Sequence, residues 1–260
     1  MSTTLLVIRD TRDVPVPAYL DWPHPIPFAH RGGASDAPEN TMQAFDYAVK
    51  LGYRYIETDV QVTADGVLMA FHDSNLKRTC GIDRRIGDMT FKEVSTARVD
   101  GLAPIPKLED LIGEWPDVRV NIDCKADAAV PALASAIKRT NSIDRVCVTA
   151  FDDRRVHKVR SMVGPSLCTA LGPAGVALLR IGAPFKTLCT AAQVPVKQGP
   201  LTIVNERFIS RAHSRGLKVH VWTIDDPSEM NHLLDIGVDG LMTDRPMVLR
   251  DVLTQRKAWV

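Results

Sequence analysis

The sequence lacks the features that mark membrane-spanning, secreted and nucleic-acid-binding proteins. Near its start, only residues 5–8 form an apolar run before charges intervene, which is too short for a signal-peptide core or a membrane span. Its five cysteines are scattered and form no CxxC pair, so they contain no metal or redox motif. With 32 basic and 31 acidic residues the net charge is +1, which gives no reason to expect a nucleic-acid partner. We therefore expect a cytoplasmic protein without stable membrane insertion.

The length and composition indicate one globular domain. A chain of 260 residues fits one barrel-sized domain better than two small ones, and such a domain buries enough surface to need no disulfide or structural metal. Hydrophobic residues make up 45% and charged residues 24%, as in ordinary globular proteins. Residues 1–24, which include Pro15, Pro17 and Pro23, are predicted to form an irregular N-terminal arm. The barrel-sized domain is expected to cover residues 25–260.

Short apolar runs alternate with helical patterns along the chain, which is typical of βα units around a parallel sheet. The runs cover residues 26–30, 53–60, 118–123, 146–150, 167–171, 186–192, 217–223 and 240–242. Eight strands close a barrel, so the sequence predicts an α/β fold of the (β/α)₈ or TIM-barrel type. Residues 74–106 contain three glycines and two prolines and do not fit this alternation. They are predicted to form a small insertion after the second strand.

Two helices carry recognisable end signals. Asn40 precedes an amphipathic segment that stops at Gly52, so Asn40 is predicted to cap the helix start. Asp226 and Pro227 likewise precede a helical segment that stops at Gly237, with the proline at the first helical position.

Two acidic residues share one face of the second predicted strand. Strand side chains alternate faces, so Glu57 and Asp59 in the segment YIETDV point the same way. Like charges this close raise each other's pKa unless a cation lies between them. Hard divalent cations such as Mg²⁺ or Ca²⁺ prefer such oxygen ligands. The pair therefore indicates a metal site, with a solvated strand edge as the alternative.

A third carboxylate ends the third predicted strand. In the segment NIDCK, Asp123 and Lys125 lie on one face after an apolar entry. Asp123 would complete a metal site at the barrel mouth, and Lys125 would place a point positive charge beside a phosphate oxygen. A surface salt bridge at the strand end is the alternative for these two residues.

Two histidines lie at element ends beside charged residues. His30 ends the first strand and is followed by Arg31, whereas His72 ends the run 67–71 and is followed by Asp73. Imidazole, with a pKa of about 6.5, exchanges protons near neutral pH. Phosphodiester cleavage needs a base for the attacking oxygen and an acid for the leaving oxygen, and Arg31 could bind the phosphate with its planar guanidinium. Taken alone, a histidine after an apolar strand is more often a core residue, but two histidines at element ends beside charged groups favour a catalytic pair.

Taken in order, these motifs resemble the signature of the glycerophosphodiester phosphodiesterase family. The motifs are His30-Arg31-Gly32, Glu39-Asn40-Thr41, Glu57-Thr58-Asp59, Asp65-Gly66, His72-Asp73 and Asp123-Cys124-Lys125. Residues 219–226 (VHVWTIDD) and 237–246 (GVDGLMTDRP) resemble the last two strands of that family. The resemblance covers nearly the whole chain from residue 25 to residue 249.

The resemblance implies a metal-dependent phosphoric diester hydrolase of lipid and glycerol metabolism. Its small-molecule substrates would be glycerophosphodiesters, cleaved to sn-glycerol 3-phosphate and an alcohol, with the glycerol hydroxyl as internal nucleophile and a cyclic phosphate as intermediate. By the same resemblance, the acid/base pair is His30 and His72. One divalent cation, Mg²⁺ or Ca²⁺, would be held by Glu57, Asp59 and Asp123. Arg31 and Lys125 would hold the phosphate, and Trp222 would wall the pocket.

Two positions depart from the family pattern. The third acidic position is commonly Glu but is Asp123 here, as in the related spider-venom sphingomyelinase D-type phospholipases. The usual Asn after the Trp strand is replaced by Asp225 and Asp226. A lysophospholipase D or sphingomyelinase D-like activity on lysophospholipids is therefore an alternative. It would require an apolar groove, and the predicted insertion offers only scattered apolar residues.

Two further alternatives concern other classes of barrel. A non-catalytic barrel that binds a phosphorylated ligand would be expected to have lost a catalytic group, yet both histidines and all three carboxylates are present. A metal-dependent amidohydrolase barrel would favour a His-x-His motif on the first strand, which is absent from this sequence.

Overall fold

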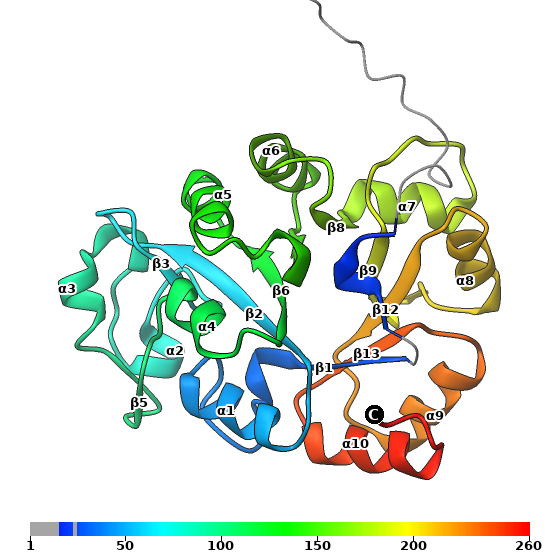
Figure 1. Cartoon of the computed structure of the whole chain (residues 1–260), viewed down its shortest axis with the longest axis horizontal. Helices are drawn as coiled ribbons and strands as arrows, with labels where there is room; N and C mark the ends of the chain where they lie inside the picture. Colours follow the sequence, from blue (N-terminus) through cyan, green and yellow to red (C-terminus); the bar gives the residue numbers. More distant parts are fainter. Residues whose placement is uncertain (1–15, 23–24) are drawn as a thin grey trace, which may run out of the picture.

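The computed structural model describes residues 16–22 and 25–260, so most of the predicted N-terminal arm lies outside the described residues. Eight parallel strands pair in a closed ring, because β1 pairs with both β2 and β13. The strands are β1 (Ile26–Ala29), β2 (Tyr55–Val62), β6 (Arg119–Cys124), β7 (Val146–Thr149), β8 (Cys168–Leu171), β9 (Ala191–Pro195), β12 (Lys218–Trp222) and β13 (Gly240–Thr243). The predicted (β/α)₈ barrel is confirmed (Figure 1).

Helices between the strands form the outer layer of the barrel. They are α1 (Met42–Lys50), α4 (Leu108–Glu114), α5 (Ala129–Arg139), α6 (Asp153–Val163), α7 (Pro173–Ile181), α8 (Glu206–His213), α9 (Pro227–Asp235) and α10 (Pro246–Gln255). In α5, for example, Val130, Leu133 and Ile137 recur at helical spacing and are fully buried against the barrel. The main core therefore lies between the helices and the barrel. Within residues 16–22 and 25–260, no helix has the length and apolar character needed to cross a membrane.

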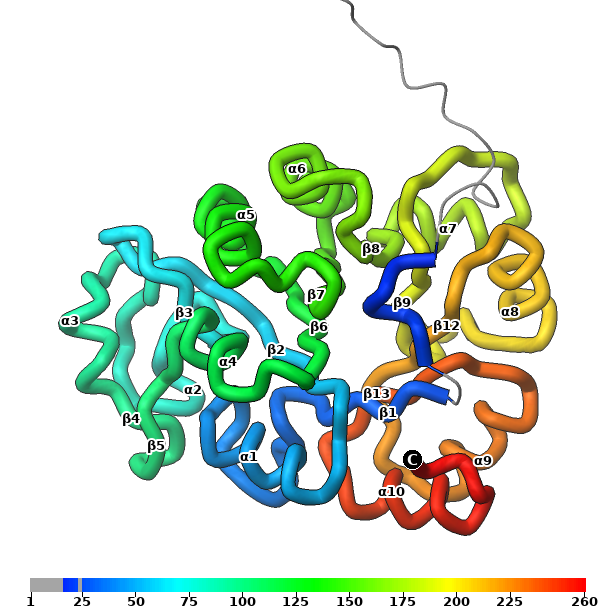
Figure 2. Tube along the Cα trace, viewed as in Figure 1, coloured from blue at the N-terminus to red at the C-terminus, as the bar shows by residue number. Residues whose placement is uncertain are grey.

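The predicted insertion after the second strand is a separate lobe at one side of the barrel (Figure 2). Its elements are β3 (Leu68–Ala70), which is antiparallel to β2, then α2 (Lys77–Cys80), η4 (Ile86–Asp88), α3 (Phe91–Val94), β4 (Arg98–Val99) and β5 (Ala103–Pro104). The lobe has its own small core, which includes Met69, Leu76 and Ile86. Because β3 runs antiparallel to the end of β2, the chain returns along β2 until the Phe71 amide donates to the Asp59 carbonyl at 2.9 Å. The residues after β3 therefore lie beside Asp59 at the mouth of the barrel.

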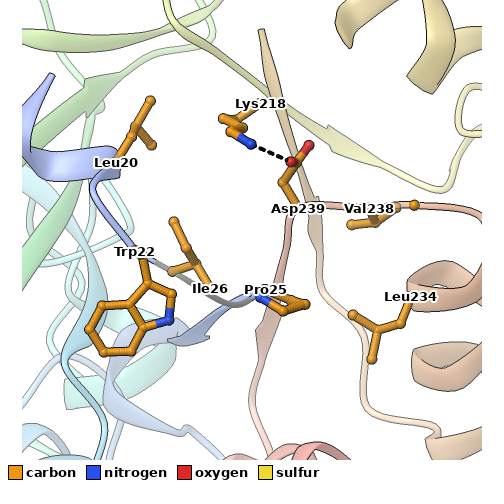
Figure 3. A pocket seen from close by; sticks show the side chains of 9 residues that line it. Leu20, Trp22, Pro25, Ile26, Lys218, Leu234, Val238 and Asp239 are labelled. Atoms are coloured by element: carbon orange, nitrogen blue, oxygen red, sulfur yellow. Dashed lines mark hydrogen bonds and ion pairs between the residues drawn. The ribbon is translucent and has the colours of Figure 1, made fainter. Parts of the chain in front are cut away.

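The amino ends of the strands are closed by the short helix η2 (Ala18–Leu20). Tyr19 is fully buried there and its carbonyl accepts a hydrogen bond of 2.6 Å from the Tyr55 hydroxyl. A cavity of about 330 Å³ lies at this end, between Trp22 and the Lys218–Asp239 ion pair (Figure 3). In barrels of this type this face serves stability, whereas the carboxyl ends of the strands carry the site.

The sixth strand is misplaced in the sequence prediction, which starts it at residue 186 and ends it at residue 192, five and three residues too early. The observed strand, β9, contains Gln193, whose side chain is buried and pairs with Asn121 inside the barrel. Apolar composition is the sequence signal for a buried strand. It therefore favours the apolar stretch before β9 over β9 itself, which carries the polar Gln193 inside the barrel.

The predicted helix cap Asn40 is also wrong. Helix α1 begins after Thr41, whose hydroxyl accepts a hydrogen bond from the Ala44 amide at 3.2 Å. Asn40 has a positive φ of 55°, a conformation that asparagine tolerates better than most residues, and its side chain points elsewhere. By contrast, Asp226 caps α9 through the Glu229 amide with Pro227 at the first helical position, as predicted.

Burial lowers the pKa of His220 to about 4, which makes the stability of the fold sensitive to acid. His220 is fully buried on β12, 3.3 Å from the Gln193 side-chain nitrogen. Because the histidine of an unfolded chain titrates near pH 6.5, the unfolded state binds more protons than the folded state between that pH and about pH 4. Folding stability is therefore lost as the pH falls through this window, by on the order of 3 kcal/mol from this group.

We expect His220→Leu to remove this loss. The difference in the free energy of unfolding between pH 7 and pH 4.5, measured with urea, should be about 2 kcal/mol smaller in the variant than in the wild type. His232→Leu, at an exposed position on α9, is the control and should keep the wild-type difference. An unchanged pH dependence in His220→Leu would contradict the assignment.

Candidate active site

A cavity of about 630 Å³ opens at the carboxyl ends of the barrel strands. All eight residues that the sequence nominated line it, namely His30, Arg31, Glu57, Asp59, His72, Asp123, Lys125 and Trp222. They come from the end of β1 and the turn η3 (His30–Gly32), from β2, β6 and β12, and from the segment that follows β3. The fold thus brings together residues that are up to 192 positions apart in the chain.

Three of these residues are carboxylates buried side by side. Glu57 and Asp59 lie on β2, and Asp123 is the register partner of Asp59 on β6. Their exposed fractions are only 4%, 2% and 5%. Burial, together with the charge of Asp59, raises the pKa of Glu57 to about 7, and burial also raises the pKa of Asp123. Burial would raise the pKa of Asp59 as well, but the charges of Lys125 and Arg31 outweigh it and lower that pKa.

Two cations partly offset these carboxylates. The Lys125 ammonium lies 2.6 Å from Asp123 Oδ2 and 2.9 Å from Asp59 Oδ1. Arg31 Nε lies 3.2 Å from Asp59 Oδ2, and another guanidinium nitrogen donates to Glu39 at 3.0 Å. Both residues that the resemblance nominates for phosphate binding are therefore engaged by carboxylates. Three buried carboxylates still outnumber the two permanent cations.

The donor set suits a hard divalent cation. Asp123 Oδ1 is buried and has no hydrogen-bond donor, and a buried acceptor left in this state is costly. Glu57 Oε2 accepts one hydrogen bond, from the Arg31 backbone amide at 3.0 Å. In the described part of the chain no three acidic, His or Cys side chains surround one point as metal ligands would. The Lys125 ammonium instead pairs with both Asp59 and Asp123. Carboxylate oxygens are nevertheless the ligands that Mg²⁺ and Ca²⁺ prefer.

Each histidine is held by a carboxylate at Nδ1. His30 Nδ1 lies 2.7 Å from Asp244 Oδ1, and His72 Nδ1 lies 2.5 Å from Asp73 Oδ1. Because a carboxylate only accepts hydrogen bonds, Nδ1 carries the hydrogen in both rings and Nε2 is left for other partners. His30 Nε2 is 3.8 Å from Glu57 Oε2. Burial lowers the pKa of His30, but the nearby carboxylates Glu57 and Asp244 outweigh it, so that the pKa is raised.

An arginine that the sequence prediction missed connects the surroundings of His72 to those of Arg31. Arg78, on α2 of the inserted lobe, donates to Asp73 Oδ2 at 2.7 Å and to both oxygens of Glu39 at 2.6 and 2.9 Å. Glu39 in turn accepts from Arg31. A continuous chain of ion pairs therefore runs from His72 to Arg31. No local pattern could have indicated Arg78, since only the folding of the lobe brings it to Glu39.

Asn40 positions Asp59. Its side-chain nitrogen donates to Asp59 Oδ2 at 3.0 Å, and its oxygen accepts from the Thr58 hydroxyl at 2.8 Å. Both partners lie on β2, and Asn40 itself is 1% exposed. The asparagine of the Glu39-Asn40-Thr41 motif therefore contributes to the site, and the following threonine supplies the helix cap.

The sequence prediction also missed three residues that line the floor and one wall of the cavity. Asn121 and Gln193 line the floor and exchange two hydrogen bonds of 2.8 and 3.1 Å. Strand alternation could have found Asn121, because it shares a face with Asp123, whereas Gln193 was hidden by the misplaced sixth strand. Phe151 forms the wall beside Trp222, with ring centroids 5.8 Å apart at an angle of 67°.

Comparison with known proteins gives one consistent family. The model of the glycerophosphoryl diester phosphodiesterase family matches residues 30–170 and 182–248. The chain is 36% identical over 244 residues to a Mycobacterium tuberculosis protein named "Probable glycerophosphodiester phosphodiesterase 2", covering 90% of this chain and 92% of the relative.

Solved structures agree with the fold. A glycerophosphodiester phosphodiesterase from Agrobacterium tumefaciens superposes with a TM-score of 0.71 at 23% identity, covering 86% of this chain and 98% of the other. An Oleispira antarctica phosphodiesterase, solved in complex with the product sn-glycerol 3-phosphate, superposes with a TM-score of 0.75 at 21% identity, covering 89% of this chain and 97% of the other.

The contact between Asp244 and His30 predicts the protonation of the imidazole. In metal-free protein, we expect the neutral His30 ring to carry its hydrogen on Nδ1. Asp244→Ala should reduce that tautomer and lower the pKa of His30, because one of the two nearby negative charges is lost. Both effects can be measured from ¹⁵N chemical shifts during a pH titration. Asp235→Ala, on α9, is the control; equal behaviour of the two variants would refute the assignment.

Proposed function

The chain belongs to the glycerophosphoryl diester phosphodiesterase family, and from this premise we propose that it hydrolyses glycerophosphodiesters to sn-glycerol 3-phosphate and an alcohol. The observation that carries the proposal is the convergence, in one cavity, of two carboxylate-bound histidines, three buried carboxylates and two cations. The product found in the related Oleispira antarctica enzyme supports the same substrate class.

The two histidines supply the proton transfers. One imidazole takes the proton of the attacking glycerol hydroxyl, whose oxygen bonds to phosphorus, while the other gives a proton to the leaving alcohol oxygen. The resulting cyclic phosphate is then opened by water with the two roles reversed. Asp244 and Asp73 orient the rings and stabilise each imidazolium as it forms, because each accepts the Nδ1 hydrogen.

The remaining charged residues bind the phosphate. Arg31 presents a planar guanidinium and Lys125 a point charge, both within the cavity. Since carboxylates already engage both cations, an anionic phosphodiester needs further positive charge to bind well. We propose that Glu57, Asp59 and Asp123 hold one divalent cation, Mg²⁺ or Ca²⁺. When bound, it supplies Lewis-acid stabilisation of the negative charge on the phosphate oxygens.

The test is turnover of glycerophosphocholine with Mg²⁺, with Ca²⁺ and with EDTA. We expect release of sn-glycerol 3-phosphate that depends on the metal and is lost in EDTA. His72→Ala should lower kcat by about a hundredfold or more, since general acid/base groups contribute at least that factor. His157→Ala, at an exposed position on α6, is the matched control. Full activity in EDTA would refute the metal site, and full activity of His72→Ala would refute the acid/base assignment.

Arg78 is expected to act as a positioning residue. Arg78→Ala removes the link between Asp73 and Glu39, so we expect kcat to fall about tenfold with a smaller change in KM. Stability should change by less than about 1 kcal/mol, as is usual for exposed ion pairs. Arg84→Ala is the control, because Arg84 makes an exposed ion pair with Glu93 in the same lobe and lies outside the cavity. An equal loss of kcat in both variants would indicate a general effect of the lobe.

A further inference from the structure

Positive charge is concentrated in one segment of the chain that the proposed chemistry does not use. Residues 173–217 run from the start of α7 past the end of α8 and contain six Lys or Arg residues but one acidic residue, Glu206. The whole chain, by contrast, carries 32 basic and 31 acidic residues. Among the described residues, no carboxylate lies within 4.0 Å of a side-chain nitrogen of any of the six. The six residues are Arg180, Lys186, Lys197, Arg207, Arg211 and Arg215.

Hydrogen bonds join the elements that carry this charge at the carboxyl end of α7. The Arg180 Nε donates to the Thr202 carbonyl at 3.1 Å, which connects α7 to the hairpin of β10 (Lys197–Gln198) and β11 (Leu201–Thr202). Lys197 is the register partner of Thr202 in that hairpin. From α8, which lies beside α7 (Figure 1), the Arg211 guanidinium donates to the Arg180 carbonyl. The end of α7, the hairpin and α8 therefore form one continuous surface.

The arginines on this surface repel one another. Loss of hydration, and then the charges of Arg207 and Arg180, lower the pKa of Arg211. Arg207 lies one helical turn before Arg211 on α8, so the two side chains share a face of that helix. The hydrogen bond from Arg211 to the end of α7 is favourable for that helix, because basic groups complement its free carbonyls. It leaves the guanidinium charges without a carboxylate, and such a cluster attracts anions.

Large apolar side chains are exposed on the same surface. Ile181 follows Arg180 at the end of α7 and is 70% exposed, and Leu201 precedes Thr202 in the hairpin and is 51% exposed. Because Arg180 and Thr202 are hydrogen-bonded, these two apolar residues lie next to bonded neighbours. Apolar residues exposed singly need no explanation, but a group set among basic residues indicates an interaction surface. The basic–apolar face consists of Arg180, Ile181, Lys197, Leu201, Arg207 and Arg211.

The combination of charge and apolar surface distinguishes between partners. A second copy of the chain in a two-fold dimer would bring this face against itself, and its like charges would repel. A single-stranded nucleic acid would pair its phosphates with the arginines but stacks its bases on aromatic rings, whereas the exposed side chains here are aliphatic. An anionic lipid bilayer matches both features. Its head groups attract Lys and Arg, and aliphatic side chains enter the boundary with the acyl chains.

We propose that the basic–apolar face docks reversibly on the surface of an anionic lipid bilayer. Ile181 and Leu201 enter the acyl boundary, while the three arginines and Lys197 contact the head groups. Because Arg180, Ile181 and Leu201 also line the active-site cavity, docking brings that cavity to the lipid surface. The proposal is independent of the reaction, since docking requires no turnover.

The test is flotation of the whole chain with lipid vesicles in EDTA, which prevents metal-dependent turnover. Vesicles of phosphatidylcholine alone are compared with vesicles of two parts phosphatidylcholine to one part phosphatidylglycerol, at low and at high salt. We expect binding to the mixed vesicles that weakens with salt, and little binding to phosphatidylcholine alone. Arg207→Glu and Lys197→Glu, both exposed and outside the cavity, should each weaken binding by about fivefold or more. Ile181→Asp should weaken it by about tenfold.

Lys92→Glu and Leu102→Asp are the matched controls, because both residues are exposed in the inserted lobe, and both variants should bind like the wild type. Absence of binding, equal binding to the two kinds of vesicle, or equal losses in the controls would overturn the proposal. Binding that is lost in Arg207→Glu but kept in Ile181→Asp would mean that the face attracts anions by charge alone, which also overturns lipid docking. A loss confined to Ile181→Asp would place the lipid in the cavity instead of on this face.

Discussion

The burial of Glu57, Asp59 and Asp123 side by side on the paired strands β2 and β6 is the constraint on which the rest of the site depends. Like charges in a medium of low dielectric constant repel strongly, and each is also penalised for its loss of hydration. The surrounding residues offset this penalty with positive charge and a hydrogen bond. Lys125 and Arg31 approach the carboxylates, and Asn40 donates to Asp59. Asp123 keeps one oxygen without a donor, which is the chemical basis for expecting a bound cation.

The barrel and the inserted lobe divide the positioning of the site between them. The barrel holds the carboxylates rigidly on paired strands, where the register of β2 and β6 sets their relative heights. The lobe supplies His72 and Arg78, and it is joined to the barrel by the β2–β3 pairing and by the ion pairs of Arg78. The acid/base pair thus combines one histidine from the barrel with one from the lobe. Their relative placement depends on the packing of the small core of the lobe.

The cavity is lined by charged side chains on one side and by apolar side chains on the other. Charged residues lie on the side of β1, β2 and β6. The side of α7 and of the hairpin of β10 (Lys197–Gln198) and β11 (Leu201–Thr202) is apolar. Phe151 and Trp222 lie where the two sides meet. Residues at the strand ends carry the charges, and the segments that follow β7, β8 and β9 carry the apolar wall. Changes in these connecting segments can alter the substituent that is accepted without moving the carboxylates.

The sequence by itself determined the barrel, because alternating strand and helix patterns are local properties of the chain. It also nominated the residues around the charged half of the cavity, because strand alternation places Glu57 beside Asp59 and Asp123 beside Lys125. Only the tertiary structure decided that Lys125 lies between two carboxylates, that Arg78 links His72 to Arg31, and that Asn40 holds Asp59 instead of capping α1. It likewise placed Gln193 inside the barrel and α7 beside the cavity. These contacts join residues that are distant in sequence, and their partners are set by how the elements pack, which no local periodicity records.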